Sequence, residues 1–342
     1  MKALRLLRRW LYRSVADDTA DIIARQRAAY QQAAFLVPML CVVTLYVVMS
    51  WLTFWWQQWL DAPAPTLLWP VAWLRWTDAH AGVYFIYMLA MAAPILAMLM
   101  PQHRWTRALV FLGLLEMAAL ASSFGKINHS LHAWTSVAFV FIFLPNGYWE
   151  RRADSIRERQ LFLTTFWGAQ ALICLFYTLS GIWKLYGAFQ QLFAGEMSAF
   201  HPDALAYQIA TRLMETNSQS MLGPVILAHP WVGGPLLWGA MYIETFALVA
   251  AFRPSLHRLW GISLMLLHLG NILLLSIPFL ESMTLVSLIL IFSPFRPPVT
   301  NPRAVLRDLP ILGLLLRAIS TTTSLPNTRV ATEAQRTQRR RG

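Results

Sequence analysis

Residues 161–185 read LFLTTFWGAQALICLFYTLSGIWKL, an apolar stretch whose first charged residue is Lys184. Its length suits a helix that crosses the hydrocarbon core of a bilayer, which needs about 20 apolar residues. Similar blocks recur along the chain, in which 57% of the 342 residues are hydrophobic and 13% are charged. The mean hydropathy of +0.48 is too high for a soluble domain of this length. We therefore expect an all-α, polytopic integral membrane helix bundle.

Charged or proline-containing breaks divide the sequence into about eight predicted spans. They cover residues 33–56, 82–100, 107–124, 130–144, 161–185, 235–252, 259–277 and 279–292. The fourth and eighth are short, so either could be a tilted or re-entrant segment. The longest internal loop is expected at residues 186–234.

The chain is expected to have three parts. A basic, amphipathic cytoplasmic arm covers residues 1–32, and the transmembrane domain covers 33–296. A basic cytoplasmic tail follows at 297–342. Within it, residues 305–319 are expected to form an interfacial helix, and the polar, arginine-rich end from residue 321 is expected to be disordered.

The positions of the basic residues support this topology. Alternate loops, taken as cytoplasmic together with both termini, contain 24 of the 28 Lys and Arg residues. Such an excess is the usual signature of the cytoplasmic side. The net charge of +12 is therefore explained mainly by the topology of the chain, and attraction to anionic lipid headgroups follows from it. Nucleic acid is not an expected partner, because the basic residues are spread along the membrane edges.

Polar residues collect on the predicted non-cytoplasmic side and within the spans. They are Lys126, Asn128, His129 and His132 at the start of the fourth span, Lys184 at the end of the fifth, Glu116 in the third, Glu244 in the sixth, and His268 and Asn271 in the seventh. Ionisable residues inside a membrane usually face the bundle interior and pair with one another. We expect several of these groups to share one chamber.

Each of these residues also has an ordinary explanation. Lys184 could extend to the membrane interface, or it could face a protein-lined cavity that favours its neutral form and makes it a usable base. His132 could be a hydrated interfacial histidine, and His268 could hydrogen-bond a neighbouring helix. His129 and His132 are spaced to chelate a metal, but no Cys, Asp or Glu follows at a ligand spacing, so no metal is expected.

Three motifs resemble one family. Asn128-His129-Ser130-Leu131, followed by residues 138–149, resembles the stretch of the vitamin K-dependent gamma-glutamyl carboxylase in which Asn-His-Ser opens a membrane helix that ends near Asn-x-Tyr-Trp. Residues 180–185, Ser-Gly-Ile-Trp-Lys-Leu, resemble its Ala-Gly-x-x-Lys-Leu segment. The run that begins at His268 resembles its late helix. The match covers residues 30–296 in order and spacing, and the broader group is the HTTM (horizontally transferred transmembrane domain) family.

The resemblance implies quinol chemistry. Lys184 would be the base that deprotonates a reduced quinone, menaquinone or a vitamin K-like quinol, and His129 would be its electrostatic partner. We expect the substrate to contact Asn128, His132, Trp183, Glu244, His268 and Asn271. The carboxylase's lumenal propeptide-binding domain has no counterpart in this tail, and Trp-x-x-Gly becomes Leu192-Phe-Ala-Gly195. Propeptide-directed glutamate carboxylation is therefore not implied.

Three functional classes are compatible with the sequence. The first is a quinol-dependent oxidoreductase or carboxylase-like lyase in a bacterial inner membrane. The second is a non-catalytic module that binds quinone or lipid, or a membrane or periplasmic protein partner. The third, a transporter with an acidic site at Glu116 and Glu244, lacks the inverted repeat that such folds usually show.

Overall fold

The computed structural model describes residues 19–61, 65–125, 129–146 and 155–315; for residues 19–21, 52–61 and 79 it describes the backbone alone. All regular secondary structure in these ranges is helical, which confirms the all-α class. The chain divides into two compact units, Met1–Arg296 and Pro297–Gly342. The start of the basic arm and the tail from residue 321 lie outside the described residues.

Five helices are long and apolar enough to cross a membrane. They are α2 (Thr19–Asp61), α3 (Ala79–Leu99), α4 (Arg104–Ser122), α6 (Ile156–Ala194) and α11 (His257–Leu275). Together they contain most of the first, second, third, fifth and seventh predicted spans. Helix α6 is the longest of these after α2, and its 39 residues rise about 58 Å, nearly twice the thickness of a bilayer's hydrocarbon core.

The other three predicted spans are shorter or interrupted. Helix α5 (His132–Phe141) has 10 residues and rises about 15 Å, half the thickness of that core. Helices α9 (Gly233–Thr245) and α10 (Ala247–Ala251) meet at Phe246. Helix α12 (Leu280–Val286) continues as a π-helix, η5 (Ser287–Ile291).

The segment predicted as a long loop at 186–234 is mostly helical. Helix α6 continues to Ala194, and α7 (Ala204–Thr216), α8 (Gly223–Ala228) and the 3₁₀ helix η3 (Pro230–Val232) follow. Leu205, Ala206, Ile209 and Ile226 bury a small apolar cluster of their own. The prolines of this segment begin or precede helices rather than ending them, which is why their presence misled the prediction.

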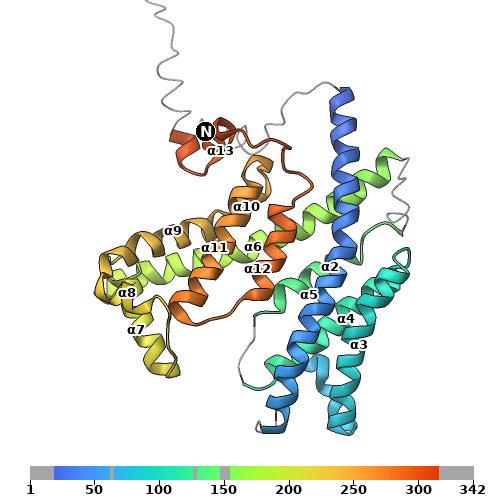
Figure 1. Ribbon diagram of the computed structural model, residues 1–342, viewed down its shortest axis with the longest axis horizontal. Helices are drawn as coiled ribbons and strands as arrows, with labels where there is room; N and C mark the ends of the chain where they lie inside the picture. Colours follow the sequence, from blue (N-terminus) through green and yellow to red (C-terminus); the bar gives the residue numbers. More distant parts are fainter. Residues whose placement is uncertain (1–18, 62–64, 126–128, 147–154, 316–342) are drawn as a thin grey trace, which may run out of the picture. The chain divides into compact units, whose positions relative to one another are not determined.

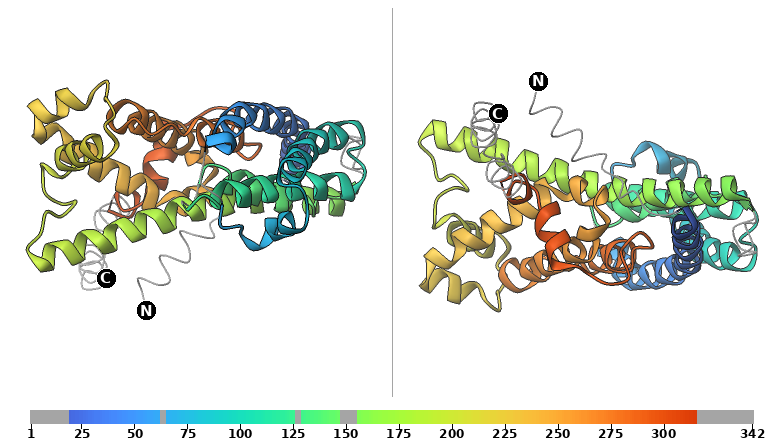
Figure 2. Two further views of the ribbon diagram at one scale, coloured as in Figure 1. Left: turned by 90° about the horizontal axis from the view of Figure 1, so that it is seen from below. Right: turned by 90° about the horizontal axis from the view of Figure 1, so that it is seen from above.

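Helix α6 connects the two parts of the first unit (Figure 1). Its N-terminal half packs with α2 and α5, and α3 and α4 pack beside these. Its C-terminal half packs against α9 and α10, which in turn contact α11. In Figure 2 the helix runs past both groups in each view. Two further 3₁₀ helices, η1 (Trp69–Trp76) and η4 (Pro254–Leu256), precede α3 and α11.

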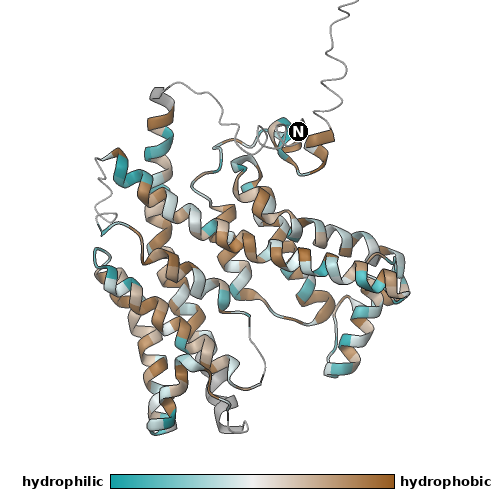
Figure 3. Ribbon diagram, turned by 180° about the vertical axis from the view of Figure 1, so that it is seen from behind, coloured by the Kyte–Doolittle hydropathy of each residue, from teal (hydrophilic) through white to brown (hydrophobic). Residues whose placement is uncertain are grey.

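The main core lies among α2 to α6. Its largest fully buried side chains include Trp134, Phe162, Phe166, Ile86 and Leu114. The helices are mostly hydrophobic along their length, with hydrophilic residues toward several helix ends (Figure 3), and many large apolar side chains are exposed. An apolar exterior of this kind is expected where lipid rather than water surrounds the protein.

Arg107 on α4 holds the end of the short helix α5. Its buried guanidinium donates to the carbonyl oxygens of Phe141 (3.0 Å), Leu144 (2.6 Å) and Pro101 (2.7 Å), and to Oδ1 of Asn146 (3.3 Å). The last carbonyls of a helix have no partner within the helix and carry partial negative charge. Arg107 therefore provides hydrogen-bond donors for the carbonyl groups at the end of α5, so the helix can end inside the protein.

The second unit contains helix α13 (Pro302–Asp308). Asn301 caps its start by accepting a hydrogen bond from the Arg303 amide at 3.0 Å, and Pro302 occupies the first turn, where no amide donor is needed. The helix ends before Pro310, and a separate turn follows at residues 312–315. Within residues 305–315, the expected continuous helix is thus divided at this proline, which cannot continue the hydrogen-bond pattern, and residues 316–319 of that prediction lie outside the described residues.

Candidate functional site

Gly181 allows helices α6 and α9 to touch. A Cβ atom at this position would lie 2.4 Å from the backbone nitrogen of Thr245 and 2.7 Å from its hydroxyl oxygen, closer than real side chains come. Lys184 follows Gly181 by one helical turn and so lies on the same face of α6. Glu244 precedes Thr245 on α9. The close approach of the two backbones therefore sets Lys184 opposite Glu244.

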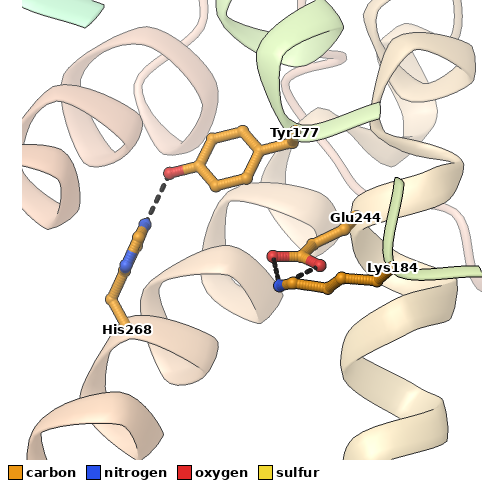
Figure 4. Close-up of polar contacts among 4 residues, drawn as sticks. All are labelled: Tyr177, Lys184, Glu244 and His268. Atoms are coloured by element: carbon orange, nitrogen blue, oxygen red, sulfur yellow. Dashed lines mark hydrogen bonds and ion pairs between the residues drawn. The ribbon is translucent and has the colours of Figure 1, made fainter. Parts of the chain in front are cut away.

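Lys184 and Glu244 form an ion pair (Figure 4). The Lys184 Nζ atom donates to both carboxylate oxygens, each at 2.6 Å. The lysine side chain is 48% exposed, whereas the glutamate side chain is 5% exposed. The pair thus connects an accessible amine to a buried carboxylate, 60 residues away in the sequence.

A second polar pair lies beside the first. The Tyr177 hydroxyl is 2.5 Å from Nε2 of His268, and both side chains are shown with the ion pair in Figure 4. Tyr177 lies two turns before Lys184 on α6, while His268 comes from α11. Figure 4 shows the two pairs side by side, with Glu244 provided by α9. Three helices thus contribute to one polar cluster.

His268 retains unused hydrogen-bonding capacity. The side chain is buried, and its Nδ1 atom has no hydrogen-bond partner among the described residues. Buried polar atoms are nearly always satisfied, so an unpaired imidazole nitrogen beside an ion pair indicates a position where a ligand or water binds. The ring of Phe279 lies against the imidazole at 5.2 Å between centroids.

The interruption between α9 and α10 is stabilised by side chains of neighbouring helices. The Leu248 amide donates to the Thr178 hydroxyl at 2.9 Å, and the Trp260 indole donates to the Ile243 carbonyl at 2.9 Å. These bonds satisfy backbone groups that the interruption leaves without helical partners. They also fix the end of α9, and therefore Glu244, against α6 and α11.

The other predicted residues make no hydrogen bond to Lys184 or Glu244 among the described residues. His129 is exposed and contacts His132, and no hydrogen bond or ion pair joins His129 to Lys184 within the described residues. Asn128 lies outside the described residues. The Trp183 side chain is 74% exposed and contacts the ring of Tyr186. Asn271 is half-buried on α11, one turn after His268.

The two acidic residues of the transporter hypothesis have different partners. Glu116 on α4 accepts a hydrogen bond from the Trp73 indole of η1 at 3.0 Å, whereas Glu244 binds Lys184. An indole donor satisfies a carboxylate without providing a second titratable group. These contacts do not link Glu116 with Glu244 in a shared acidic site.

Comparison with known proteins adds no relative: no protein-family model matches the chain, and neither do curated proteins or solved structures. The fold and the site therefore define the class by themselves. It is an all-helical protein with five helices long and apolar enough to cross a membrane, and with a polar cluster built by α6, α9 and α11.

Proposed function

We propose that the chain is an HTTM-type integral membrane enzyme that oxidises an isoprenoid quinol, with chemistry like that of the vitamin K-dependent carboxylase. The observation that carries the proposal is the Lys184–Glu244 ion pair beside Tyr177 and His268. A base that accepts a proton in a membrane needs a partner to keep charge balanced, and this cluster provides one.

Glu244 gives Lys184 a route to the neutral form that a base requires. An ammonium group cannot accept a proton, but transfer of one proton along the 2.6 Å contact yields a neutral amine and a carboxylic acid. A low-dielectric environment favours the neutral pair over two separated charges. The amine then takes one proton from the quinol. The quinolate transfers two electrons and its remaining hydroxyl proton to dioxygen, which gives quinone and hydroperoxide anion, and the Lys184 ammonium returns its proton to form hydrogen peroxide. Glu244 thus performs the partner role that the resemblance assigned to His129.

The Tyr177–His268 pair is suited to position the quinol. A quinol head carries two oxygen atoms on opposite sides of its ring, so it needs a second polar contact besides the base. The unpaired Nδ1 atom of His268 provides such a contact, while the Tyr177 hydroxyl on Nε2 fixes the orientation of the imidazole. We propose His268 for this positioning role.

The surface beside Lys184 suits entry from lipid. Trp183 and Tyr186 are exposed next to the half-exposed lysine, and a Cβ atom on Gly187 would meet nothing within 4 Å. An isoprenoid tail partitions into the hydrocarbon phase, so a head-group site near an open, aromatic helix face allows lateral access. The proposed substrate is reduced menaquinone or a vitamin K-like quinol.

The proposed topology places the site on the non-cytoplasmic side. It keeps eight membrane segments, with α5, α9–α10 and α12–η5 as short or interrupted ones, and both termini in the cytoplasm. The support is the partition of 24 of 28 basic residues to one side. The basic cytoplasmic edges would then bind anionic lipid headgroups.

The test measures oxidation of reduced menaquinone by dioxygen with purified protein. Lys184→Ala is expected to lower the rate by at least 100-fold, a typical contribution of acid–base catalysis. Gln190→Ala is the matched control, because Gln190 is exposed on the same helix and bonds only Tyr186 among the described residues. Recovery of Lys184→Ala activity by a small soluble amine would separate a base from a structural residue. Equal turnover by Lys184→Ala and the unaltered protein would refute the base assignment.

The alternative function is a non-catalytic membrane module that binds quinone, lipid or a partner protein. Its supporting observation is that the ion pair also joins α6 to α9 next to the Gly181 contact, a structural use of the same residues. Under this alternative, Lys184→Met lowers thermal stability, and neither the variant nor the unaltered protein oxidises the quinol.

A further inference from the structure

His129 and His132 bring two imidazole nitrogens close together, apart from the Lys184–Glu244 and Tyr177–His268 pairs. Their Nδ1 atoms are 3.3 Å apart, and the rings are nearly perpendicular, at 86° with centroids 5.0 Å apart. The backbone fixes this arrangement, because the His132 amide donates to the His129 carbonyl at 3.2 Å in the turn that begins α5. We propose that the two histidines chelate a divalent transition metal, and that Zn²⁺ is the metal that fits.

The separation of the two nitrogens fits a hydrogen bond and also fits a chelate. At 3.3 Å one imidazole can donate a long hydrogen bond to the other when no ion is bound. Two Zn–N bonds of about 2.0–2.1 Å at a tetrahedral angle place their nitrogens about 3.3–3.4 Å apart. The two histidines are therefore already at the separation that a tetrahedral ion would need.

Imidazole nitrogens bind Zn²⁺, Cu²⁺ and Ni²⁺. We choose Zn²⁺ as the proposed ion because its usual tetrahedral geometry fits the observed separation of the two nitrogens. Zn²⁺ has no geometric preference from its d electrons and is usually tetrahedral in proteins.

The remaining coordination positions are open to water. No group of three or more His, Cys, Asp or Glu side chains could hold a metal in the part of the chain that the structure describes. His129 is exposed, so solvent reaches the pair. Zinc sites usually have three or four protein ligands, so two histidines would hold the ion less tightly, with water in the remaining positions. Sequence spacing alone did not predict this metal, since it gives no distance between rings.

The test is calorimetric titration of Zn²⁺ into metal-stripped protein that carries no histidine tag. One Zn²⁺ per chain is expected, with affinity at least 10-fold lower in His129→Ala and in His132→Ala. His229→Ala is the matched control, because His229 is exposed at the end of α8, far from both in sequence, and should leave the affinity unchanged. In addition, Zn²⁺ should raise the melting temperature of the unaltered protein and not that of the two variants.

Cobalt provides a geometric readout. Co²⁺ bound to the pair should give the intense visible absorption of a tetrahedral site, which octahedral coordination does not give. The proposal is overturned if the unaltered protein binds no Zn²⁺, or if a variant lacking both histidines binds it equally well. These outcomes leave the quinol proposal untouched, because that proposal depends on Lys184, Glu244 and His268.

Discussion

At the residue scale, replacing Lys184 and replacing Glu244 leave charged groups with different exposure to solvent. Glu244→Gln leaves a half-exposed ammonium group, whereas Lys184→Met leaves a carboxylate that is only 5% exposed. Removing one partner of a buried pair costs about 3–5 kcal/mol because the other charge is left uncompensated. We therefore expect Lys184→Met to lower the free energy of unfolding in detergent by more than Glu244→Gln does. The double variant should recover part of the loss, and equal costs for the two single variants would contradict the asymmetry.

Gly181 and Gly187 provide a matched pair on one helix. Gly181→Ala forces a Cβ atom to within 2.4 Å of the Thr245 backbone, while Gly187→Ala enters open space. Overpacking of this kind costs about 1–3 kcal/mol, and alanine in an open helical position gains about 0.5–1 kcal/mol over glycine. Thermal unfolding should therefore show a lower melting temperature for Gly181→Ala and an unchanged or higher one for Gly187→Ala. A Gly181→Ala protein as stable as the unaltered one would show that α6 and α9 are not in close contact.

The candidate site was only partly predictable at this scale. Lys184, Glu244 and His268 stood out because charged or titratable residues are costly inside apolar segments. Their pairing was not predictable, since Lys184 and Glu244 are 60 residues apart and their meeting depends on the Gly181 contact. Tyr177 was missed because a tyrosine within an apolar helix is usually interpreted as a residue that packs against neighbouring helices. Its signal was its spacing of seven residues from Lys184, which places both on one face of α6.

At the element scale, the end of α5 depends on one side chain from another helix. Arg107→Met removes the donor that the carbonyls of Phe141, Leu144 and Pro101 share. The Phe141 carbonyl also accepts from the Leu144 amide at 3.2 Å, so the variant deprives the Leu144 and Pro101 carbonyls of their donor. Each buried acceptor left unpaired costs about 1–3 kcal/mol, so the free energy of unfolding should fall. Arg104→Met is the control, since Arg104 is exposed on the first turn of the same helix and rests over the Phe143 ring. Similar melting temperatures for the two variants would contradict the capping role of Arg107.

The limits of prediction at this scale have a physical cause. Apolar length is a local property, so the sequence predicted a membrane span within each of α2, α3, α4, α6 and α11. The predicted limits lie within a few residues of the ends of α3, α4 and α11. Helix α2, however, begins 14 residues before the predicted start at residue 33, and α6 ends 9 residues after the predicted end at residue 185. Helix α5 stops early because Arg107 satisfies its carbonyls, and α9 is interrupted because Thr178 and Trp260 satisfy its backbone. Both depend on contacts between helices, which no local pattern encodes.

At the scale of the whole molecule, the proposed topology assigns each connection to a side of the membrane. The connection between α3 and α4, which contains Gln102, is expected in the cytoplasm, and the connection after α7, which contains Gln219, on the opposite side. Both side chains are exposed. Only two cysteines are present, Cys41 and Cys174, so a cysteine-free background is easily made.

A membrane-impermeant maleimide then tests the number of spans. In intact cells, Gln219→Cys should be labelled, and Gln102→Cys should be labelled only after the membrane is opened. The two positions lie on opposite sides of the membrane in the proposed topology, so an odd number of crossings between them is required. With α4, α5 and α6 between them, that number is three, including the 10-residue helix α5. If α5 enters and leaves on one side, the number falls to two and both cysteines react alike. Equal labelling would therefore show that α5 does not cross the membrane. His129 and Lys184 would then lie on opposite sides of the membrane.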